Sequence, residues 1–296
     1  MSENKHKAGF VNIVGNPNVG KSTIMNALVG ERISIITSKS QTTRHRIMGI
    51  VNGDDFQIVY SDTPGVIKPN YKLQESMLKY SRSALVDADV ILYVTDVKED
   101  PDKNLEFLDS VKSSNTPVIL IINKIDLSNQ AEVEQLVLAW QERFPKAEIY
   151  PTAALHNFNL ENLLDRIKAL LPENPPYFDK DALTDKPERF FVTEIIRGKI
   201  LENYRKEIPY SVEPEVEEFK EEEKIIRIMV KIHVERDSQK GIIIGHKGVA
   251  IKKVGIESRK ELEVFFDKQV HLEMFVTVSK DWRNKEPKLK SFGYEQ

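Results

Sequence analysis

The sequence predicts two domains: an α/β domain with a mostly parallel sheet flanked by helices, followed by a smaller α+β domain. Two continuous apolar runs, 90–95 and 117–122, are typical of strands that are buried on both faces. Helical patterns lie between and after them, and this alternation is characteristic of parallel sheets. Three prolines within 172–176 then interrupt the chain. The length of 296 residues gives each domain room for its own core.

The first domain begins with a predicted strand, a glycine-rich turn and a helix. The apolar run 10–14 stops at Gly15, and helical apolar spacing covers 23–29. The turn between them, G-N-P-N-V-G-K-S, has the spacing of a phosphate-binding loop, which arises by chance in about one chain in a hundred. Such a loop points backbone N–H groups at a phosphate, while Lys21 reaches the β- and γ-phosphates and Ser22 offers its hydroxyl to Mg²⁺. The nucleotide-binding residues expected here are Gly15, Asn16, Pro17, Asn18, Val19, Gly20, Lys21, Ser22 and Thr23.

A second motif follows one predicted hairpin later. After the polar stretch 34–46, the runs 45–51 and 55–60 predict two strands joined at 52–53, an Asn-Gly turn. The second strand leads into the turn D-T-P-G. An acid at the end of a buried strand beside a phosphate loop is placed to hold Mg²⁺, and the glycine N–H can bind a γ-phosphate. The residues expected to contact the nucleotide or its metal are Asp62, Thr63, Pro64 and Gly65.

Two motifs at later strand ends indicate the base. N-K-I-D follows the run 117–122, and T-A-A follows a short strand over 148–150. The Asp126 carboxylate can accept from N1–H and the 2-amino group of guanine, so the site should reject adenine by ~10⁴ or more. Lys124 is expected over the base plane, and Asn123 is expected to tie this segment to the phosphate loop. Taken alone, Asp126 is better explained as a helix N-cap, but four motifs in order favour the base. The base-binding residues expected are Asn123, Lys124, Asp126, Thr152, Ala153 and Ala154.

The series GNPNVGKS, TT, DTPG, NKID and TAA resembles the translation-factor-related GTPases in order and spacing. The resemblance implies a P-loop GTPase domain that binds GTP and GDP with Mg²⁺. It also implies that Ala153 donates its backbone N–H to guanine O6, and that Thr42 or Thr43 is the switch threonine on Mg²⁺. The sequence does not choose between these threonines. The catalytic residues implied are Lys21, Thr42, Thr43 and Gly65, and the metal ligands are Ser22, Thr42, Thr43 and Asp62.

The residue after D-T-P-G departs from the Ras-like pattern. Val66 stands where Ras-like enzymes have the glutamine that positions the attacking water, and valine neither donates nor accepts a hydrogen bond. We therefore expect slow intrinsic hydrolysis. Asn18 matches the asparagine that binds K⁺ in related GTPases, which makes K⁺ a further expected cofactor. A turn-forming role explains Asn18 equally well on sequence grounds.

The domain boundary is expected where the prolines follow a last amphipathic helix. Residues 1–172 are predicted to form the GTPase domain, 173–188 a stiff linker, and 189–296 the second domain. A second phosphate loop is absent from the sequence, so the chain is not a tandem GTPase.

The second domain carries a basic segment. A predicted helix over 189–207 precedes strands over 210–217 and 225–234, and residues 236–260 then hold seven Lys or Arg against two acids. Within that segment, G-H-K-G follows what reads as the end of an apolar strand and precedes a basic amphipathic helix, which resembles the RNA clamp of a KH domain. An ordinary turn before a helix with solvated lysines is the alternative. The RNA-binding residues expected are Ile244, Gly245, His246, Lys247, Gly248, Ile251, Lys252 and Lys253.

With a last strand over 270–278, the order of elements matches the type II KH arrangement. A GTPase domain followed by a type II KH domain, with Q-T-T-R-H-R in 41–46, resembles the Era family of bacterial ribosome-assembly GTPases over nearly the whole chain. The resemblance implies a monomer that binds the 3′ end of small-subunit ribosomal RNA rather than DNA, and that assists assembly of the small ribosomal subunit. Some family members also associate peripherally with the inner membrane.

Composition agrees with a cytoplasmic protein. The chain has no cysteine, no apolar run near the ~20 residues of a membrane span, and no apolar signal-peptide core at its polar N-terminus. We expect a cytoplasmic location, with the peripheral association at the inner face of the cell membrane that the family resemblance implies. The net charge of −3 argues against indiscriminate binding of nucleic acid.

Two other functions share part of this pattern. A nucleotide-sensing RNA-binding chaperone with incidental GTP hydrolysis would carry the same motifs, but RNA should not stimulate its turnover. A tRNA-modifying GTPase would carry a catalytic cysteine, which this chain lacks.

Overall fold

The computed structural model describes residues 6–294, which form two compact units. The first unit comprises residues 6–69 and 77–185, and the second comprises residues 70–76 and 186–294. Within the described residues, no helix has both the length and the apolar character needed to cross a membrane.

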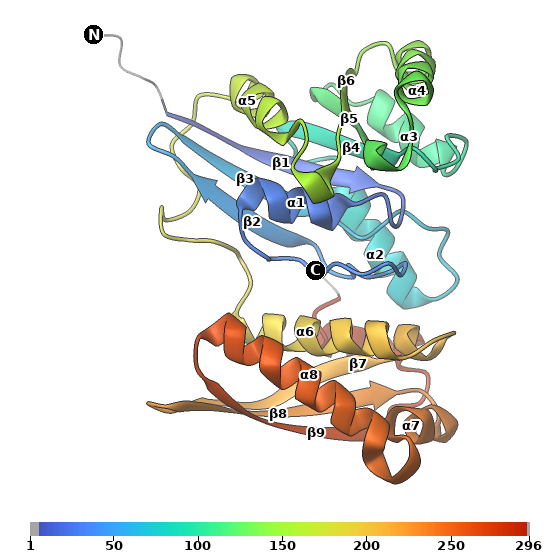
Figure 1. Cartoon of the computed structure of the whole chain (residues 1–296), viewed down its shortest axis with the longest axis vertical. Helices are drawn as coiled ribbons and strands as arrows, with labels where there is room; N and C mark the ends of the chain where they lie inside the picture. Colours follow the sequence, from blue (N-terminus) through green and yellow to red (C-terminus); the bar gives the residue numbers. More distant parts are fainter. Residues whose placement is uncertain (1–5, 295–296) are drawn as a thin grey trace. The chain divides into compact units, whose positions relative to one another are not determined.

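The first unit is an α/β fold built on a six-stranded sheet of order β2-β3-β1-β4-β5-β6 (Figure 1). Strand β2 runs antiparallel to β3, and the other neighbouring strands are parallel. The strands are β1 (Lys7–Gly15), β2 (Ile47–Asn52), β3 (Phe56–Asp62), β4 (Val90–Asp96), β5 (Val118–Asn123) and β6 (Glu148–Pro151). The helices are α1 (Lys21–Val29), α2 (Lys72–Ser83, of which residues 77–83 belong to this unit), α3 (Leu105–Lys112), α4 (Gln130–Arg143) and α5 (Leu160–Leu170).

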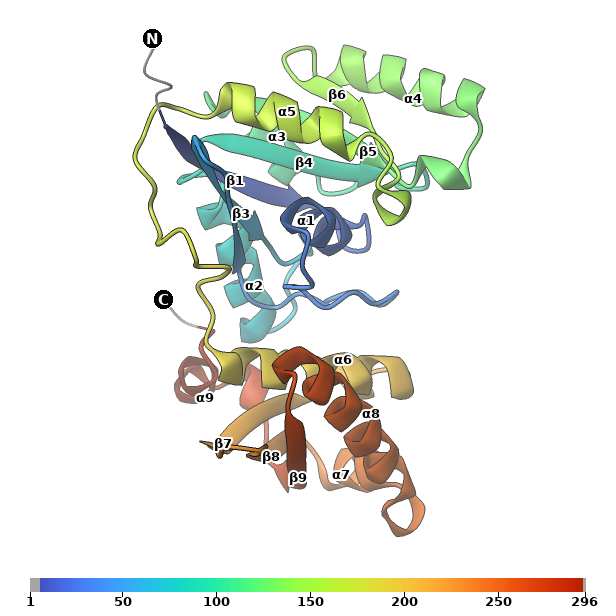
Figure 2. The same ribbon diagram turned by 60° about the vertical axis from the view of Figure 1, so that its left-hand side comes forward.

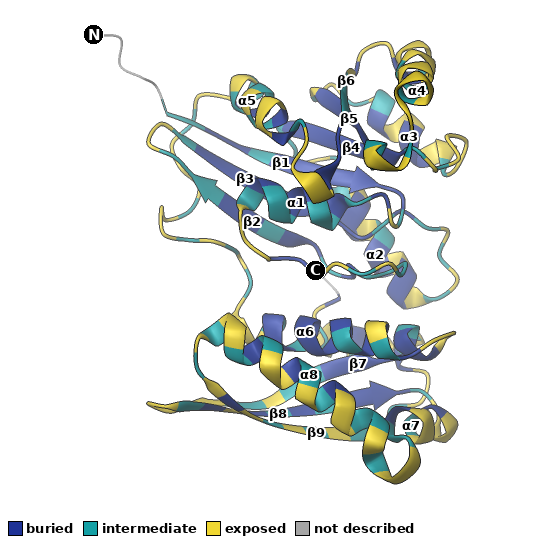
Figure 3. Ribbon diagram, viewed as in Figure 1, coloured by how far each residue is buried: buried dark blue, intermediate teal, exposed yellow. Residues whose placement is uncertain are grey.

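The central strands are apolar because helices cover both faces of the sheet. Every residue of β4 and β5 is buried, as the continuous apolar runs predict. Helices α1 and α5 lie on one face and α2 and α3 on the other (Figure 2). On the second face, Phe107, Leu108 and Val111 of α3 and Trp140 of α4 pack against β4 and β5. Figure 3 shows the contrast between the buried strands and the exposed outer face of α4.

The strand register gathers the functional motifs at one edge of the sheet. Ile13 pairs with Asp62, and Gly15 pairs with Val94, so β1, β3 and β4 end together. Asp96 pairs with Asn123 at the end of β5. The phosphate loop, the D-T-P-G turn and the N-K-I-D segment therefore all begin at the carboxyl edge, where ligands of such sheets bind.

The proline-rich segment after α5 is fastened to the first unit. Over residues 173–185 it runs beside β2 and β3 rather than forming a free linker. The fully buried Gln57 side chain accepts hydrogen bonds from the backbone N–H groups of 177–178 and donates to the carbonyl of the second residue. Further along, the Ile50 N–H donates to Leu183 O at 2.8 Å. Past α5, the chain groups with the second unit only from residue 186 onward.

The second unit has the type II KH arrangement. Its three-stranded sheet has the order β7-β8-β9, with β8 antiparallel to β7 and parallel to β9. The strands are β7 (Glu213–Glu221), β8 (Ile225–Val234) and β9 (Gln269–Val278). The helices are α6 (Glu188–Asn203), α7 (Asp237–Ile244), α8 (Val249–Phe266) and α9 (Glu286–Ser291).

The G-H-K-G turn follows a helix, which corrects the expectation that it follows the end of a strand. Three consecutive β-branched residues, 242–244, read as strand, yet they form the last turn of α7. Helix α7 begins at Asp237 because Gln239 Oε1 accepts from the backbone N–H groups of Glu235 and Arg236, at 2.9 and 3.0 Å. The cap satisfies two backbone N–H groups between the end of β8 and the first residue of α7, which stabilises the start of the helix.

Candidate nucleotide and RNA sites

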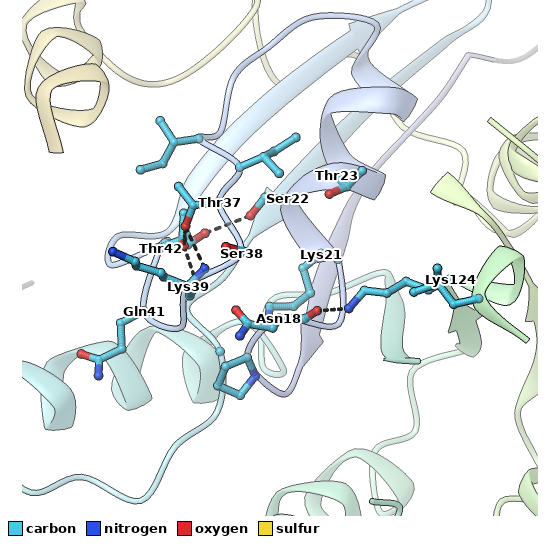
Figure 4. Close-up of a pocket in the computed structure, with 17 residues that line it drawn as sticks. Asn18, Lys21, Ser22, Thr23, Thr37, Ser38, Lys39, Gln41, Thr42 and Lys124 are labelled. Atoms are coloured by element: carbon cyan, nitrogen blue, oxygen red, sulfur yellow. Dashed lines mark hydrogen bonds between the residues drawn. The ribbon is translucent and has the colours of Figure 1, made fainter. Parts of the chain in front are cut away.

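A cavity of ≈ 430 Å³ opens at the carboxyl edge of the six-stranded sheet, within the size range of small-molecule sites. Its walls come from the phosphate loop, the polar stretch 35–43, Gly65, Lys124 and Leu127 (Figure 4). The sequence-predicted residues that line it are Pro17, Asn18, Gly20, Lys21, Ser22, Thr23, Thr42, Thr43, Gly65 and Lys124.

Glycine is required at both ends of the phosphate loop. Gly15 and Gly20 have φ angles of 147° and 97°, in the region that favours glycine. A Cβ on Gly15 would lie 2.2 Å from Val94 O, and one on Gly20 would lie 2.2 Å from Asn123 Nδ2. The loop therefore passes too close to β4 and β5 for any side chain at these two positions. Asn18 has a φ of 66°, a left-handed backbone that asparagine adopts in turns, so it acts as a turn former in this loop.

Lys21 is folded back over the loop that precedes it. Its Nζ donates to Gly15 O at 3.2 Å and to Asn16 O at 2.8 Å. Burial lowers the pKa of Lys21 to about 8, an effect larger than the opposing attraction of Asp62. The ammonium is thus poorly compensated, and an anionic phosphate in the cavity would stabilise it.

Ser22, Thr43 and Asp62 converge on one point beside Lys21. The Ser22 hydroxyl donates to Asp62 Oδ2 at 2.6 Å and lies 3.0 Å from Thr43 Oγ1, which donates to the same carboxylate oxygen at 3.2 Å. Burial raises the pKa of Asp62, although Lys21 and the hydroxyls oppose this shift. Among the described residues, Asp62 Oδ1 finds no hydrogen-bond partner although it is buried. Two hydroxyls and a carboxylate with an unsatisfied oxygen fit Mg²⁺, which prefers oxygen ligands.

The two adjacent threonines have different surroundings. Thr42 Oγ1 donates to Lys39 O at 2.7 Å and lies 2.7 Å from Thr37 Oγ1, so its hydroxyl is used within the polar stretch. Thr43 alone of the pair reaches Ser22 and Asp62. The structure thereby distinguishes two residues that the sequence leaves equivalent.

Asn123 joins three motifs, and its contact with the phosphate loop is the one expected. Its Nδ2 donates to Val19 O at 2.9 Å. Its Oδ1 accepts from Thr152 Oγ1 at 3.2 Å and from the Ala154 N–H at 3.1 Å. One amide side chain therefore fixes the N-K-I-D and T-A-A segments against the phosphate loop.

Of the remaining base-motif residues, Lys124 lines the cavity, whereas Asp126, Thr152, Ala153 and Ala154 lie outside its lining. Lys124 donates from Nζ to Asn18 O and to Asp96 Oδ2. The Asp126 side chain is 27% exposed, and its Oδ2 lies 3.9 Å from His156 Nε2. The Ala153 N–H makes one long bond, 3.4 Å, to Phe158 O. The Asp126 carboxylate is thus accessible to a base.

Two residues of the D-T-P-G turn support it from inside rather than facing the cavity. Thr63 Oγ1 donates to Ile13 O at 2.8 Å, and Pro64 O accepts from Ser81 Oγ at 2.7 Å. Val66 is buried in the core under α3, so its side chain does not enter the cavity. Gly65 is the member of the turn that lines the cavity.

A second hollow, of ≈ 290 Å³, lies between α8 and β9 in the second unit. Of the predicted RNA-binding residues, Ile251 and Lys252 line it. The G-H-K-G turn adjoins the start of α8, with φ angles of 71° at Gly245 and 78° at Gly248. Ile244, Gly245, His246, Lys247, Gly248 and Lys253 are not part of the hollow's lining.

Sequence analysis missed most of the residues that line this hollow, which are Gly255, Ile256, Arg259, Leu272 and Met274. A signal was present, because 251, 255 and 259 are four residues apart and share one helix face. A Cβ on Gly255 would lie 2.9 Å from Met274 Cε, so glycine lets β9 approach the helix.

Comparison with known proteins identifies both units. A family model described as 50S ribosome-binding GTPase matches residues 10–124, and a KH-domain model matches residues 207–283. The GTPase Era of Geotalea daltonii is 44% identical over 297 residues, with 100% of each chain covered. The chain belongs to the GTPase Era family. It is therefore a P-loop GTPase followed by a KH domain, as the sequence motifs predict.

Other Era proteins agree over the same length. The GTPase Era of Staphylococcus epidermidis is 40% identical, with 98% of each chain covered. A variant of Aquifex aeolicus Era bound to GDP·AlF4⁻ superposes with a TM-score of 0.94 at 38% identity, covering 98% of this chain and 100% of that one. An Era structure in complex with MgGDPNP and nucleotides 1506–1542 of 16S ribosomal RNA matches with the same score, identity and coverage.

Proposed function

We propose that this Era-family GTPase is a nucleotide-controlled switch that binds the 3′ end of small-subunit ribosomal RNA and assists assembly of the small ribosomal subunit. One observation carries the proposal: the Era structure with a TM-score of 0.94 to this chain holds MgGDPNP together with nucleotides 1506–1542 of 16S ribosomal RNA. The cavity in the GTPase unit and the hollow between α8 and β9 support the proposal, since each could accept one of these ligands.

In the nucleotide site, backbone N–H groups of the phosphate loop and the Lys21 ammonium bind the phosphates. Ser22, Thr43 and Asp62 would hold Mg²⁺, which when bound neutralises charge on the β- and γ-phosphate oxygens. The Gly65 N–H donates to the γ-phosphate, and Asp126 selects guanine by accepting from N1–H and the 2-amino group. Hydrolysis needs a water in line with the bond to the leaving oxygen, and Val66 cannot orient it.

We propose that Asn18 holds K⁺ near the phosphates, where the ion supplies charge that an arginine finger supplies in other GTPases. Asn18 lines the cavity with an exposed side chain, which supports this role. Replacing K⁺ by Na⁺ should then slow hydrolysis, and Asn18→Ala should remove the difference between the two salts. Equal rates of the native protein in both salts would exclude the ion.

In the KH unit, the glycines of G-H-K-G let the backbone approach RNA phosphates, and Lys247, Lys252 and Lys253 neutralise them. The apolar residues between α8 and β9 offer a floor on which unpaired bases pack. Arg259 adds a further cation to the rim of that floor.

Binding to an RNA fragment that carries the 3′ end of 16S ribosomal RNA tests the RNA assignment. Gly248→Asp adds a negative charge beside the phosphates, at a position where a Cβ meets no atom within 4 Å but where φ is 78°. Aspartate is among the residues that tolerate this backbone, so the variant should abolish RNA binding while its circular dichroism spectrum stays native. Gly241→Asp is the control for the added charge, because the same side chain enters open space on α7. Equal RNA affinities of the two variants, at one fixed salt concentration, would contradict the assignment.

Multiple-turnover hydrolysis separates the switch from a chaperone with incidental activity. RNA should stimulate turnover of GTP by the native protein but not by Gly248→Asp. In cells depleted of the protein, incomplete small subunits should accumulate. The native gene should restore the level of complete small subunits, and the gene for Gly248→Asp should not. Normal subunit profiles after depletion would remove the assembly role.

We also propose a cytoplasmic location with peripheral association at the inner face of the cell membrane, on the strength of the family resemblance. Salt washing of isolated membranes should release the protein. Its absence from every membrane fraction would contradict the peripheral association.

A further inference from the structure

Asn104 precedes α3 in an unusual conformation. It has φ 55° and ψ 44°, a left-handed backbone that side chains seldom adopt, and its side chain makes no capping bond to the helix. Asparagine before a helix ordinarily caps it by accepting from the N–H two or three residues on. The Asn104 backbone carbonyl accepts the first hydrogen bonds of α3, from the N–H groups of Phe107 and Leu108 at 3.0 and 3.2 Å, but the side chain contributes no bond to the helix.

The side-chain amide is used outside the helix. Its Nδ2 donates to Asn16 Oδ1 at 2.5 Å and to Val66 O at 2.9 Å. Asn16 is a buried member of the phosphate loop, and its main-chain oxygen accepts from Lys21 Nζ. One amide therefore bridges the phosphate loop and the residue that follows D-T-P-G.

Val66 is held from the other side as well. Its N–H donates to Gly15 O at 3.1 Å, and its side chain is 4% exposed in the core. Gly65 presses onto the phosphate loop, since a Cβ there would lie 2.7 Å from Pro17 Cα. The turn is thus fixed by one bond at the start of Val66, by packing, and by Asn104 at the carbonyl.

We propose that Asn104 is a positioning residue for GTP hydrolysis, because it locks the Gly65–Val66 turn to the phosphate loop. The inference rests on the proposed role of the Gly65 N–H at the γ-phosphate. In the same structure Thr43 Oγ1 contacts Ser22 and Asp62. The Asn104 bonds to the Gly65–Val66 turn therefore occur together with a polar stretch 34–46 that is folded onto the phosphate loop. GDP lacks the γ-phosphate. The bonds of Asn104 should therefore affect the affinity for GTP and the rate of hydrolysis, but not the affinity for GDP.

Two variants of the full chain test this role. Asn104→Gly keeps the left-handed backbone, which glycine adopts readily, and deletes both hydrogen bonds. Asn104→Asp keeps the shape but replaces the donor by a carboxylate that faces two oxygens. For both variants, the affinity for a non-hydrolysable GTP analogue and the single-turnover rate should fall about 3- to 10-fold, as expected when part of the free energy of the two lost hydrogen bonds stabilises the bound γ-phosphate. GDP affinity should stay within about twofold of the native value.

Lys206→Gly is the matched control, because Lys206 is exposed, has a φ of 55° and lies in the KH unit. It should change neither nucleotide affinity nor the rate. An equal loss of GDP and GTP-analogue affinity in the Asn104 variants would assign them a scaffold role only, and unchanged values would remove any role. Either result leaves the RNA tests of the proposed function intact, because those are read in the native chain and in Gly248→Asp.

Discussion

Single polar side chains hold the nucleotide site together. Asn123, whose contact with the phosphate loop the sequence predicts, contacts three motifs, and Asn104, which belongs to none of the predicted motifs, contacts two. Amide side chains suit this task because each offers two donors and an acceptor on one rigid group. The charged residues of the site, Lys21 and Asp62, are both buried, so the free protein keeps them in an unfavourable environment that ligands relieve.

Base selection should depend on one carboxylate. Asp126→Asn replaces the acceptor by an amide that can donate to the 2-oxo group of xanthine. We expect the variant to lose GTP affinity by about 10²-fold or more and to gain affinity for xanthosine triphosphate, because unpaired polar groups are costly in such a site. Titration calorimetry measures both, and retained GTP affinity would show that Asp126 does not read the base.

The lowered pKa of Lys21 should appear as proton uptake on nucleotide binding. With a pKa of about 8 in the free protein, about half of the Lys21 side chains are neutral at pH 8. Bound phosphates raise that pKa, so nucleotide binding should take up about half a proton at pH 8, less at pH 7 and more at pH 8.5. Calorimetric titration of MgGDP in buffers with different ionisation enthalpies measures the uptake.

Lys21→Arg provides the control for this titration, since arginine stays charged throughout the range. Its binding should take up no proton at this position. A native uptake that is flat between pH 7 and pH 8.5 would contradict the buried, partly neutral lysine.

At the scale of elements, the segment 173–185 behaves as part of the GTPase unit. It lies beside β2, the strand that directly follows the polar stretch 34–46. Thr184 Oγ1 donates to Met48 O at 2.7 Å, near the point where that stretch ends. A shift of β2 would therefore move this segment, which leads into α6.

Gln57 is the main fastening of this segment. Gln57→Leu removes its bonds to the backbone of 177–178 and leaves those N–H groups without their partner. The amides at 177 and 178 should exchange with solvent about 5- to 150-fold faster, the equivalent of roughly 1–3 kcal/mol for an unsatisfied buried group. Hydrogen exchange followed by mass spectrometry measures the change.

Gln130→Leu, the same substitution at an exposed position on α4, should leave exchange at 177–178 unaltered. Protection of these amides that persists in Gln57→Leu would mean that the segment is held by its β2 contacts alone.

At the scale of the whole molecule, a GTPase unit and an RNA-binding unit share one chain. In the proposed mechanism Thr43 holds Mg²⁺ and the Gly65 N–H donates to the γ-phosphate, so we expect the segments that carry these two residues to change order when that phosphate is lost. Two ligands that shift the same conformational equilibrium must affect each other equally.

We therefore expect reciprocal coupling between nucleotide and RNA. A GTP analogue should raise RNA affinity relative to GDP by about 5- to 150-fold, and RNA should raise the preference for the analogue by the same factor. Fluorescence titrations in both directions, at one salt concentration, measure the two factors. RNA affinities that do not differ between the two nucleotides would indicate tethered but independent modules.

The sequence by itself determined the fold class, the strands and helices of the first unit, the nucleotide motifs and the G-H-K-G turn. These features are local: apolar periodicity, glycine positions and short motifs depend on neighbouring residues and on burial that repeats along the chain. The family resemblance followed from their order. Helix α7 was not predicted, and the strand end expected at 242–244 was wrong, because the β-branched run outweighed the cap that Gln239 makes at the start of the helix.

Only the tertiary structure decided which of Thr42 and Thr43 reaches Asp62, that 173–185 is fastened to the sheet, and that Asn104 bridges Asn16 and Val66. Each of these depends on contacts between residues far apart in the chain. Adjacent threonines have the same local signal, and an asparagine before a helix reads as an ordinary cap. Strand register and packing bring their distant partners within hydrogen-bond distance, and no local pattern encodes that distance.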